Sequence, residues 1–266
     1  MLAPLAAAAL LSGLAPPPPG APIPRDPGRL AVRLHETTQA LDSAVGRWRA
    51  TAPSARSPAK VTLYALYQQR IVITLTARRP IGAAVLRRLP ASEARPLRSE
   101  LLARSELGRL SRPQPLRAFR TGPAEPATQL RRHYLVAQRR FGVDWRVLAA
   151  VNFVESAFNK LRNTSTAGAQ GPMQFLPTTW RAYGLGGNVR DPHDAILGAA
   201  NYLHANGAPR NYRRALFRYN PSWSYVDAVM RYARLIRGDR RAFFVLYSRQ
   251  VFVRTPHGLV RLTGPR

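Results

Sequence analysis

The chain has 266 residues, a formal net charge of +28 and no cysteine, and 45% of its residues are hydrophobic. Because that apolar fraction is enough for a core, the composition excludes a protein that is disordered throughout. The lack of cysteine excludes disulfides, thiol nucleophiles and thiolate metal sites. The five histidines have no metal-ligand spacing, so we expect no metal and no other cofactor.

The positive charge comes almost entirely from arginine, because Lys60 and Lys160 are the only lysines among 41 basic residues. A surface of this charge attracts polyanions such as nucleic acid, anionic lipid headgroups or phosphate-bearing polymers. The sequence contains no Cys/His finger, no basic region leading into heptads and no aromatic RNA-binding strand motif. We therefore expect no nucleic-acid partner. The base composition of a genome is an alternative source of the arginine bias.

The first residues resemble an export signal. Residues 1–15 are mostly leucine and alanine, and four prolines follow directly. This run is too short to span a membrane comfortably and has the length of a signal-peptide core. It lacks a preceding Lys or Arg, so a mis-called start codon or a disordered arm is the alternative. We assign residues 1–27 to a signal peptide and proline-rich arm, which tethers the protein to a membrane if it is not cleaved.

Residues 28–111 are predicted to be a helical region of unassigned role. Apolar residues recur at helical spacing in four segments, 29–50, 61–76, 81–88 and 93–110. The second segment is rich in β-branched residues, but its sixteen residues without a break favour helix over strand. A scaffold that packs on the following region is favoured over a targeting or regulatory module. Residues 112–127 contain four prolines and are predicted to be a linker.

The region 128–238 contains helix signals throughout. Asp144 and Asp191 stand where helix N-caps are expected, and Asp191 is followed by proline and an acid in the first turn. The predicted helices cover 128–141, 145–158, 192–206, 213–219 and 222–238. Residues 239–266 contain three short β-rich runs, 243–247, 250–254 and 259–262, which predict a small antiparallel hairpin or three-stranded sheet. Structural support is its expected role.

Glu155 is the residue most strongly marked for chemistry. It follows Leu148, Val151 and Asn152 at helical spacing, which places its carboxylate on the face expected to pack inward. Burial on that face would raise the pKa of Glu155. A charge on an apolar face costs free energy and therefore commonly has a function. An ion pair with a nearby arginine such as Arg162 is the structural alternative.

Four ordered segments, 155–159, 167–174, 199–203 and 215–220, resemble the motifs of the soluble lytic transglycosylase family, relatives of goose-type lysozyme. The resemblance covers roughly residues 128–238. Two departures from the common pattern are Pro172, where many members carry leucine, and Arg218, where alanine is usual. Pro172 occurs in a recognisable subgroup, and Arg218 is placed to alter a sugar subsite.

The resemblance implies a mainly α, lysozyme-like catalytic domain that cleaves the β-1,4 bond between MurNAc and GlcNAc in peptidoglycan. Glu155 would act as general acid and then as general base, closing a 1,6-anhydro ring without water. The family's substrate-binding positions correspond to Ser156, Gly171, Met173, Gln174, Tyr219 and Asn220. Tyr219 is expected at the glutamate or the N-acetyl group, glycines are expected to let the backbone approach the sugar, and Met173 is either an apolar side of the cleft or core.

A single carboxylate fits this mechanism. Most glycosidases use two, yet Glu155 is the only glutamate from residue 128 onward. Of the aspartates, Asp144, Asp191 and Asp194 are expected at helix starts, and Asp227 on a helix surface. Two alternatives remain open: a hydrolytic muramidase of the same fold, and a basic protein that binds wall polymers or nucleic acid through an inactive lysozyme-like domain.

The resemblance also predicts where the protein acts and with what. Glycan strands of peptidoglycan are the expected substrate, and anionic wall polymers are the expected partners of the positive surface. Export would place the protein in the bacterial cell envelope, either in the wall or outside the cell. We expect a monomer.

Overall fold

The computed structural model describes residues 15–51 and 56–265. Most of the segment predicted as an export signal lies outside the described residues. Helices dominate the described part, and a two-stranded antiparallel sheet lies near its C-terminal end, so the mainly α fold class is confirmed. No helix in the described ranges combines the length and the apolarity that crossing a membrane requires.

The four helices predicted before the linker are present, with bounds α1 (Pro27–Thr51), α2 (Ala59–Ala77), α3 (Arg79–Leu86) and α4 (Ala91–Leu110). The β-branched segment adopts helix because both halves of α2 find apolar partners. Val61 and Ala65 pack into one hydrophobic cluster, whereas Ile71 and Leu75 pack into a second one among α1 to α4. Burial along both halves of the helix outweighs the modest helix propensity of these residues.

The next region contains α5 (Ala127–Phe141), α6 (Trp145–Ser156), α7 (Pro177–Tyr183), α8 (Pro192–Ala205), α9 (Tyr212–Tyr219) and α10 (Trp223–Gly238). The predicted caps are confirmed: Asp144 accepts from the backbone N–H of Arg146, and Asp191 accepts from that of Asp194. The seven-residue α7 was not predicted. Its start is set by Pro177 at the first helical position.

The strand expected over 243–247 is wrong, because this segment is a helix, α11 (Ala242–Ser248). Its aromatic residues suggested a strand, but Phe243 and Tyr247 are buried in the large core. The ring of Phe244 also meets that of Trp48 from α1 at 5.4 Å. The hairpin that follows is confirmed, with β1 (Phe252–Thr255) paired antiparallel to β2 (Gly258–Arg261).

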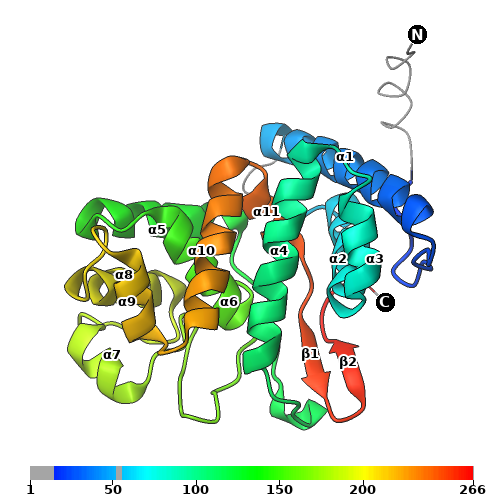
Figure 1. Ribbon diagram of the computed structural model, residues 1–266. Helices are drawn as coiled ribbons and strands as arrows, with labels where there is room; N and C mark the ends of the chain where they lie inside the picture. Colours follow the sequence, from blue (N-terminus) through cyan, green and yellow to red (C-terminus); the bar gives the residue numbers. More distant parts are fainter. Residues whose placement is uncertain (1–14, 52–55, 266) are drawn as a thin grey trace.

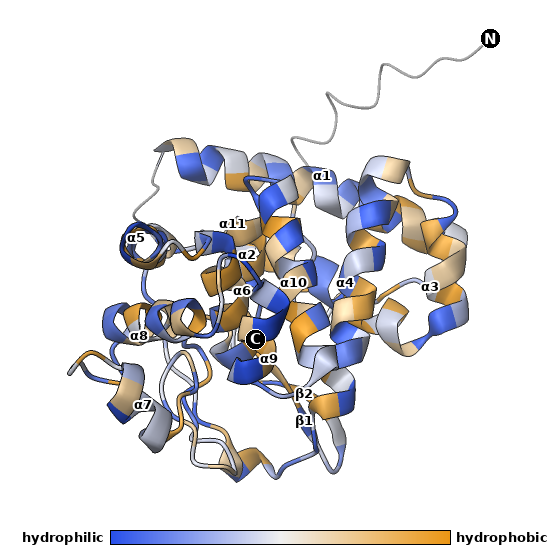
Figure 2. Cartoon of the chain, turned by 60° about the vertical axis from the view of Figure 1, so that its left-hand side comes forward, coloured by the Kyte–Doolittle hydropathy of each residue, from blue (hydrophilic) through white to orange (hydrophobic). Residues whose placement is uncertain are grey.

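One hydrophobic core joins the region before the linker to the region after it. In Figure 1, α1 to α4 lie on one side and α5, α7, α8 and α9 on the other, and α6, α10 and α11 lie between them. The most extensive packing between the two sides is that of α4 on α10. Figure 2 shows apolar segments, in orange, gathered at this centre, where α2, α6, α10 and α11 lie. Four residues of α11 belong to this core, Phe243, Phe244, Leu246 and Tyr247.

Polar contacts also hold the two sides together. The guanidinium of Arg249 forms a two-pronged ion pair with Glu100, in which Nη2 lies 3.0 Å from Oε2. Both side chains are buried. Gln250 exchanges two hydrogen bonds with the side chain of Gln69, at 2.8 and 2.9 Å. A charge buried between two elements requires such a partner.

The proline-rich segment predicted as a linker is fixed along its length. The N–H of Gln114 donates to the carbonyl of Arg254 at 3.0 Å, and the N–H of Arg162 donates to that of Arg120 at 2.8 Å. Gly122 in turn donates to the carbonyl of Lys160 at 3.0 Å. The segment therefore runs alongside the turn that follows α6 and is not a free hinge.

Candidate active site

Glu155 lies in the last turn of α6, where an unusual backbone turn follows it. Ala157, Phe158 and Asn159 all have positive φ values, of 50°, 63° and 64°. Non-glycine residues adopt this region at a cost of order 1 kcal/mol each. The fully buried ring of Phe158 offsets the cost, and Ser156 Oγ accepts from the N–H of Asn159 at 2.9 Å. The turn fixes the end of the helix that carries Glu155.

Within the residues that the structure describes, the carboxylate of Glu155 has one hydrogen-bond partner, a tyrosine of α10. The hydroxyl of Tyr225 donates to Oε1 of Glu155 at 2.6 Å. Burial raises the pKa of Glu155 to about 7, and the hydrogen bond from Tyr225 opposes the rise. The residue as a whole is only partly buried, so solvent still reaches it. Glu155 can therefore hold a proton near neutral pH and remain accessible to a ligand.

The loop 171–174 is tied to α6 by buried hydrogen bonds. The carbonyl of Pro172 accepts from Asn152 Nδ2 at 2.8 Å and from Ser156 Oγ at 2.7 Å. Asn152 itself is held by the hydroxyl of Tyr134, which donates to its Oδ1 at 2.6 Å. The loop therefore cannot move independently of the helix that carries Glu155. Ser156 is 1% exposed, so its hydroxyl holds this loop.

Gly171 is required by a close approach within the protein. Its φ is +73°, and a Cβ atom there would lie 1.8 Å from the carbonyl oxygen of Val189. Sequence reasoning expected this glycine to let the backbone reach a sugar. Gln174 also has positive φ, and its amide nitrogen donates to the carbonyls of Asn163 at 3.3 Å and Gly171 at 3.0 Å. Its side chain stabilises the loop.

The remaining candidates are Tyr219, Met173 and Asn220, and Tyr219 lies next to Tyr225, the partner of the carboxylate. The hydroxyl of Tyr219 donates to the carbonyl of Met173 at 2.5 Å, and its ring is parallel to that of Tyr225 at 6.5 Å. Burial, and then Glu155, raise the pKa of both hydroxyls well above the ordinary value. The side chain of Met173 is fully buried, as the core alternative predicted. Asn220 is partly buried directly after Tyr219.

Tyr219 was expected at the glutamate or the N-acetyl group, and of the two tyrosines it is Tyr225 whose hydroxyl donates to Glu155. A contact of Tyr219 with the N-acetyl group stays a prediction. Tyr219 acts one step away, by holding the Met173 carbonyl. Nothing in the motifs marked Tyr225. The available signal was its position on α10, where Tyr225, Val226 and Val229 face the core. The alternative partner proposed for Glu155, Arg162, instead donates to the carbonyl of Pro123 at 2.7 Å.

The aspartates of this region are engaged elsewhere. Asp144 caps α6 and pairs with Arg237 at 2.5 Å, and Asp227 pairs with Arg213 at 2.5 Å. Asp191, His193 and Asp194 form the one group of described residues whose donor atoms, within 4.8 Å of one another, would suit a metal ion. Asp191 and Asp194 accept backbone hydrogen bonds at the start of α8. The absence of a metal stays a prediction.

Comparison with known families identifies the region around this site. Residues 134–233 match the family model described as the Transglycosylase SLT domain. The chain contains an SLT domain. This domain is lysozyme-like, and the match includes Glu155, the loop 171–174, Tyr219 and Tyr225, while α1 to α4 and α11 lie outside it.

Several curated relatives match the SLT domain and its surroundings. Membrane-bound lytic murein transglycosylase F of Thiobacillus denitrificans is 32% identical over 118 residues, which are 41% of this chain and 25% of the relative. Membrane-bound lytic murein transglycosylase F 1 of Alkalilimnicola ehrlichii is 29% identical over 160 residues, which are 54% of this chain and 32% of the relative. The chain thus spans about a quarter to a third of the length of these relatives. No solved structure gives a significant match.

Proposed function

We propose that the protein is a peptidoglycan lytic transglycosylase that cleaves the β-1,4 bond between MurNAc and GlcNAc and leaves 1,6-anhydro-MurNAc ends. The observation that carries the proposal is Glu155, a residue that is only partly buried and whose pKa is raised by burial to about 7. The SLT domain and the relatives named as lytic murein transglycosylases support the same substrate.

In the first step, protonated Glu155 gives its proton to the oxygen that links the two sugars, and the glycosidic bond breaks. In the second step, the carboxylate takes the proton of the sugar's own 6-hydroxyl, whose oxygen attacks the anomeric carbon and closes the ring. An acid with a pKa near neutral pH suits both steps. Tyr225 donates to Oε1, so it orients the carboxyl group and stabilises its ionised form between the steps.

The reliance on one carboxylate favours this reaction over two-carboxylate hydrolysis. Burial and Tyr225 are the influences on the pKa of Glu155, and no second carboxylate of the described chain is among them. In glycosidases that use two carboxylates, the two catalytic carboxyl groups lie about 5 to 10 Å apart, a distance at which a second carboxylate would influence the pKa of the first. The substrate's N-acetyl group would then stabilise the intermediate in place of a second acid.

The product of digestion tests the reaction. Purified peptidoglycan treated with the protein should release fragments whose masses are lower by one water than those with reducing ends. Reducing ends would instead identify a hydrolytic muramidase of the same fold. Glu155→Gln should abolish product formation, and lysis that persists in this variant would show that the domain only binds the wall.

The proposed substrate also sets the location. Peptidoglycan lies outside the cytoplasmic membrane, so we propose that the protein acts in the cell envelope, with anionic wall polymers as partners of its positive surface. Separation of envelope and cytoplasmic fractions, followed by detection of the protein, tests the location. Recovery from the cytoplasm alone would contradict it.

A further inference from the structure

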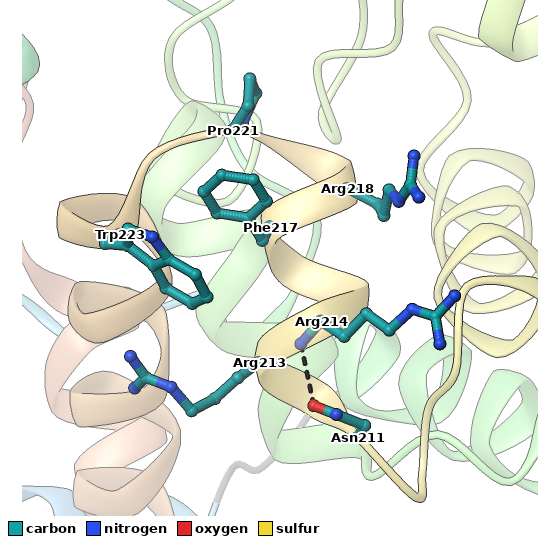
Figure 3. A pocket seen from close by; sticks show the side chains of 7 residues that line it. All are labelled: Asn211, Arg213, Arg214, Phe217, Arg218, Pro221 and Trp223. Carbon is teal, nitrogen blue, oxygen red and sulfur yellow. Dashed lines mark hydrogen bonds between the residues drawn. The ribbon is translucent and has the colours of Figure 1, made fainter.

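α9 and the start of α10 form a pocket of about 640 Å³ on the outside of the SLT domain. Its lining residues are Asn211, Arg213, Arg214, Phe217, Arg218, Pro221 and Trp223. Figure 3 shows Arg214 and Arg218 extending from one edge of α9, and Arg213 and Trp223 on the other side of Phe217. The lining holds three guanidinium groups and no carboxylate.

Two of these guanidinium groups lack a partner within the described residues. Arg213 pairs with Asp227 at 2.5 Å and lies over the ring of Trp223 at 5.2 Å. Arg214 and Arg218 are exposed, and neither side chain forms a hydrogen bond or ion pair there. They stand four residues apart on α9, where like charges repel and weaken a helix. Binding of an anion between them would remove that repulsion.

The pocket also presents an unusual apolar surface. Trp223 is 54% exposed, and its ring stacks on that of Phe217 at 4.5 Å. Phe217 is itself only partly buried. An exposed aromatic pair beside free guanidinium groups suits a ligand that carries both carboxylates and aliphatic groups.

The pocket begins where the active site ends. Arg218 directly precedes Tyr219, whose hydroxyl holds the Met173 carbonyl, and Trp223 lies two residues before Tyr225. Arg214 is one helical turn farther from the active site, about 6 Å along the axis. A group bound in the pocket would therefore lie close to the bond that Glu155 would cleave.

We propose that this pocket binds the carboxylates of the peptide stem carried by the muramyl unit at the cleaved bond. The proposal rests on the proposed function. The two sugars of the glycan are neutral where the lactyl group is amidated, so the negative charge near the bond belongs to the stem. Guanidinium groups bind carboxylates through paired hydrogen bonds, and the aromatic pair would contact the aliphatic parts of the stem.

The test compares two substrates and two double variants. Purified glycan strands are used in two forms: with their stems, and as bare strands from which an amidase has removed the stems and whose exposed lactyl carboxylates have then been capped as methylamides. For R214Q/R218Q we expect kcat/KM on stem-bearing strands to fall about tenfold or more, and kcat/KM on bare strands to stay unchanged. The control R132Q/R139Q removes the same charge from two exposed arginines of α5 outside the pocket. It should behave as the unmodified protein on both substrates.

An equal loss on both substrates would overturn the proposal, because the pocket would then bind the glycan itself. A loss seen only on walls that retain phosphate polymers would also overturn it, in favour of a phosphodiester ligand. The failure of the proposed function is a separate outcome: Glu155→Gln would then be as active as the unmodified protein, or neither would be active.

A binding measurement that needs no catalytic activity tests the ligand of the pocket even if the proposed function is wrong. Calorimetry with E155Q and the free stem tetrapeptide should show binding, and adding R214Q/R218Q should weaken it about tenfold or more. Inorganic phosphate, titrated alone, should bind more weakly than the tetrapeptide. Equal binding of the tetrapeptide with and without the two arginines would overturn the proposal.

Discussion

The hydroxyl of Tyr225 lies 2.6 Å from Oε1 of Glu155, so a residue of α10 opposes the rise that burial causes in the pKa of the carboxyl group on α6. Because this hydrogen bond lowers the pKa of Glu155 from what burial alone would give, Tyr225→Phe should raise it above about 7. In the proposed mechanism, activity requires protonated Glu155 and falls as pH rises through its pKa. The alkaline limb of kcat/KM should therefore move upward by about one pH unit in the variant.

The matched control for this measurement is Tyr183→Phe. Tyr183 lies in α7, and its ring meets that of Tyr202 at 4.9 Å. Its hydroxyl makes no hydrogen bond with Glu155, so its removal should leave the alkaline limb in place. If Tyr225→Phe leaves the limb at the same pH as Tyr183→Phe, Tyr225 does not influence the proton on Glu155.

Glu155 should also make the stability of the protein depend on pH. Its pKa is about 7 in the folded protein and near 4.5 in the unfolded chain, so the folded protein binds the proton more tightly between these values. The free energy of unfolding therefore falls as pH rises from 4.5 to 7. Glu155→Gln removes this loss and should be about 1 to 3 kcal/mol more stable at pH 8. Urea denaturation at pH 4 and pH 8 measures the difference in the free energy of unfolding between Glu155→Gln and the unmodified protein. A difference of the same size at both pH values would contradict the raised pKa.

The buried pair Glu100 and Arg249 should be strongly coupled. Glu100→Ala leaves the guanidinium of Arg249 buried without its partner, and we expect a loss of about 3 to 5 kcal/mol in the free energy of unfolding. Replacing both residues by methionine removes the uncompensated charge and should cost much less. Chemical denaturation of the single and double variants gives the coupling. A double variant as unstable as Glu100→Ala would show that packing, and not charge, is lost.

Two glycines near the active site allow a test of the Val189 contact. Gly171 and Gly168 both have positive φ, +73° and +84°, but only at Gly171 would a Cβ meet the backbone of Val189. Gly168→Ala should cost about 1 kcal/mol of stability from the backbone conformation alone. Gly171→Ala should cost at least about 3 kcal/mol and lower activity, because the loop must shift from α6. Thermal unfolding and product release compare them, and equal costs would exclude the contact.

Salt should affect the protein differently on different substrates. With a formal charge of +28, attraction to anionic wall polymers weakens as ionic strength rises. Activity on whole walls should therefore fall steeply between about 0.05 and 0.5 M salt, while activity on soluble glycan fragments changes little. Turbidity loss and fragment release measure the two. Parallel falls would mean that the positive charge acts at the active site itself.

Helix positions and caps were predictable from sequence because they depend on short-range signals. Asp144 and Asp191 act as caps at the expected residues, and the periodic segments before the linker are helices. The error over 243–247 has a long-range cause. Phe243 and Tyr247 are buried by residues far away in the chain, including Trp48, and no local pattern contains that information.

The same distinction applies to the active site. Glu155 was found from its apolar helix face and the motifs around it, which are local. Tyr225 was missed because only the packing of α10 against α6 brings its hydroxyl to the carboxylate. The roles of Ser156 and Gly171 within the protein likewise depend on Pro172 and Val189, and these contacts appear only once the chain is folded. The division into separate domains stays a prediction.

The packing of α4 on α10 has a practical consequence for anyone who wishes to produce the catalytic part alone. A gene fragment cut at the limits of the family match would lack α1 to α4 and α11. The apolar face of α10 would lose the packing of α4, its most extensive helix contact. A truncated product of this kind would expose an apolar surface and aggregate. An expressed fragment should therefore begin before Pro27 and end after Ser248.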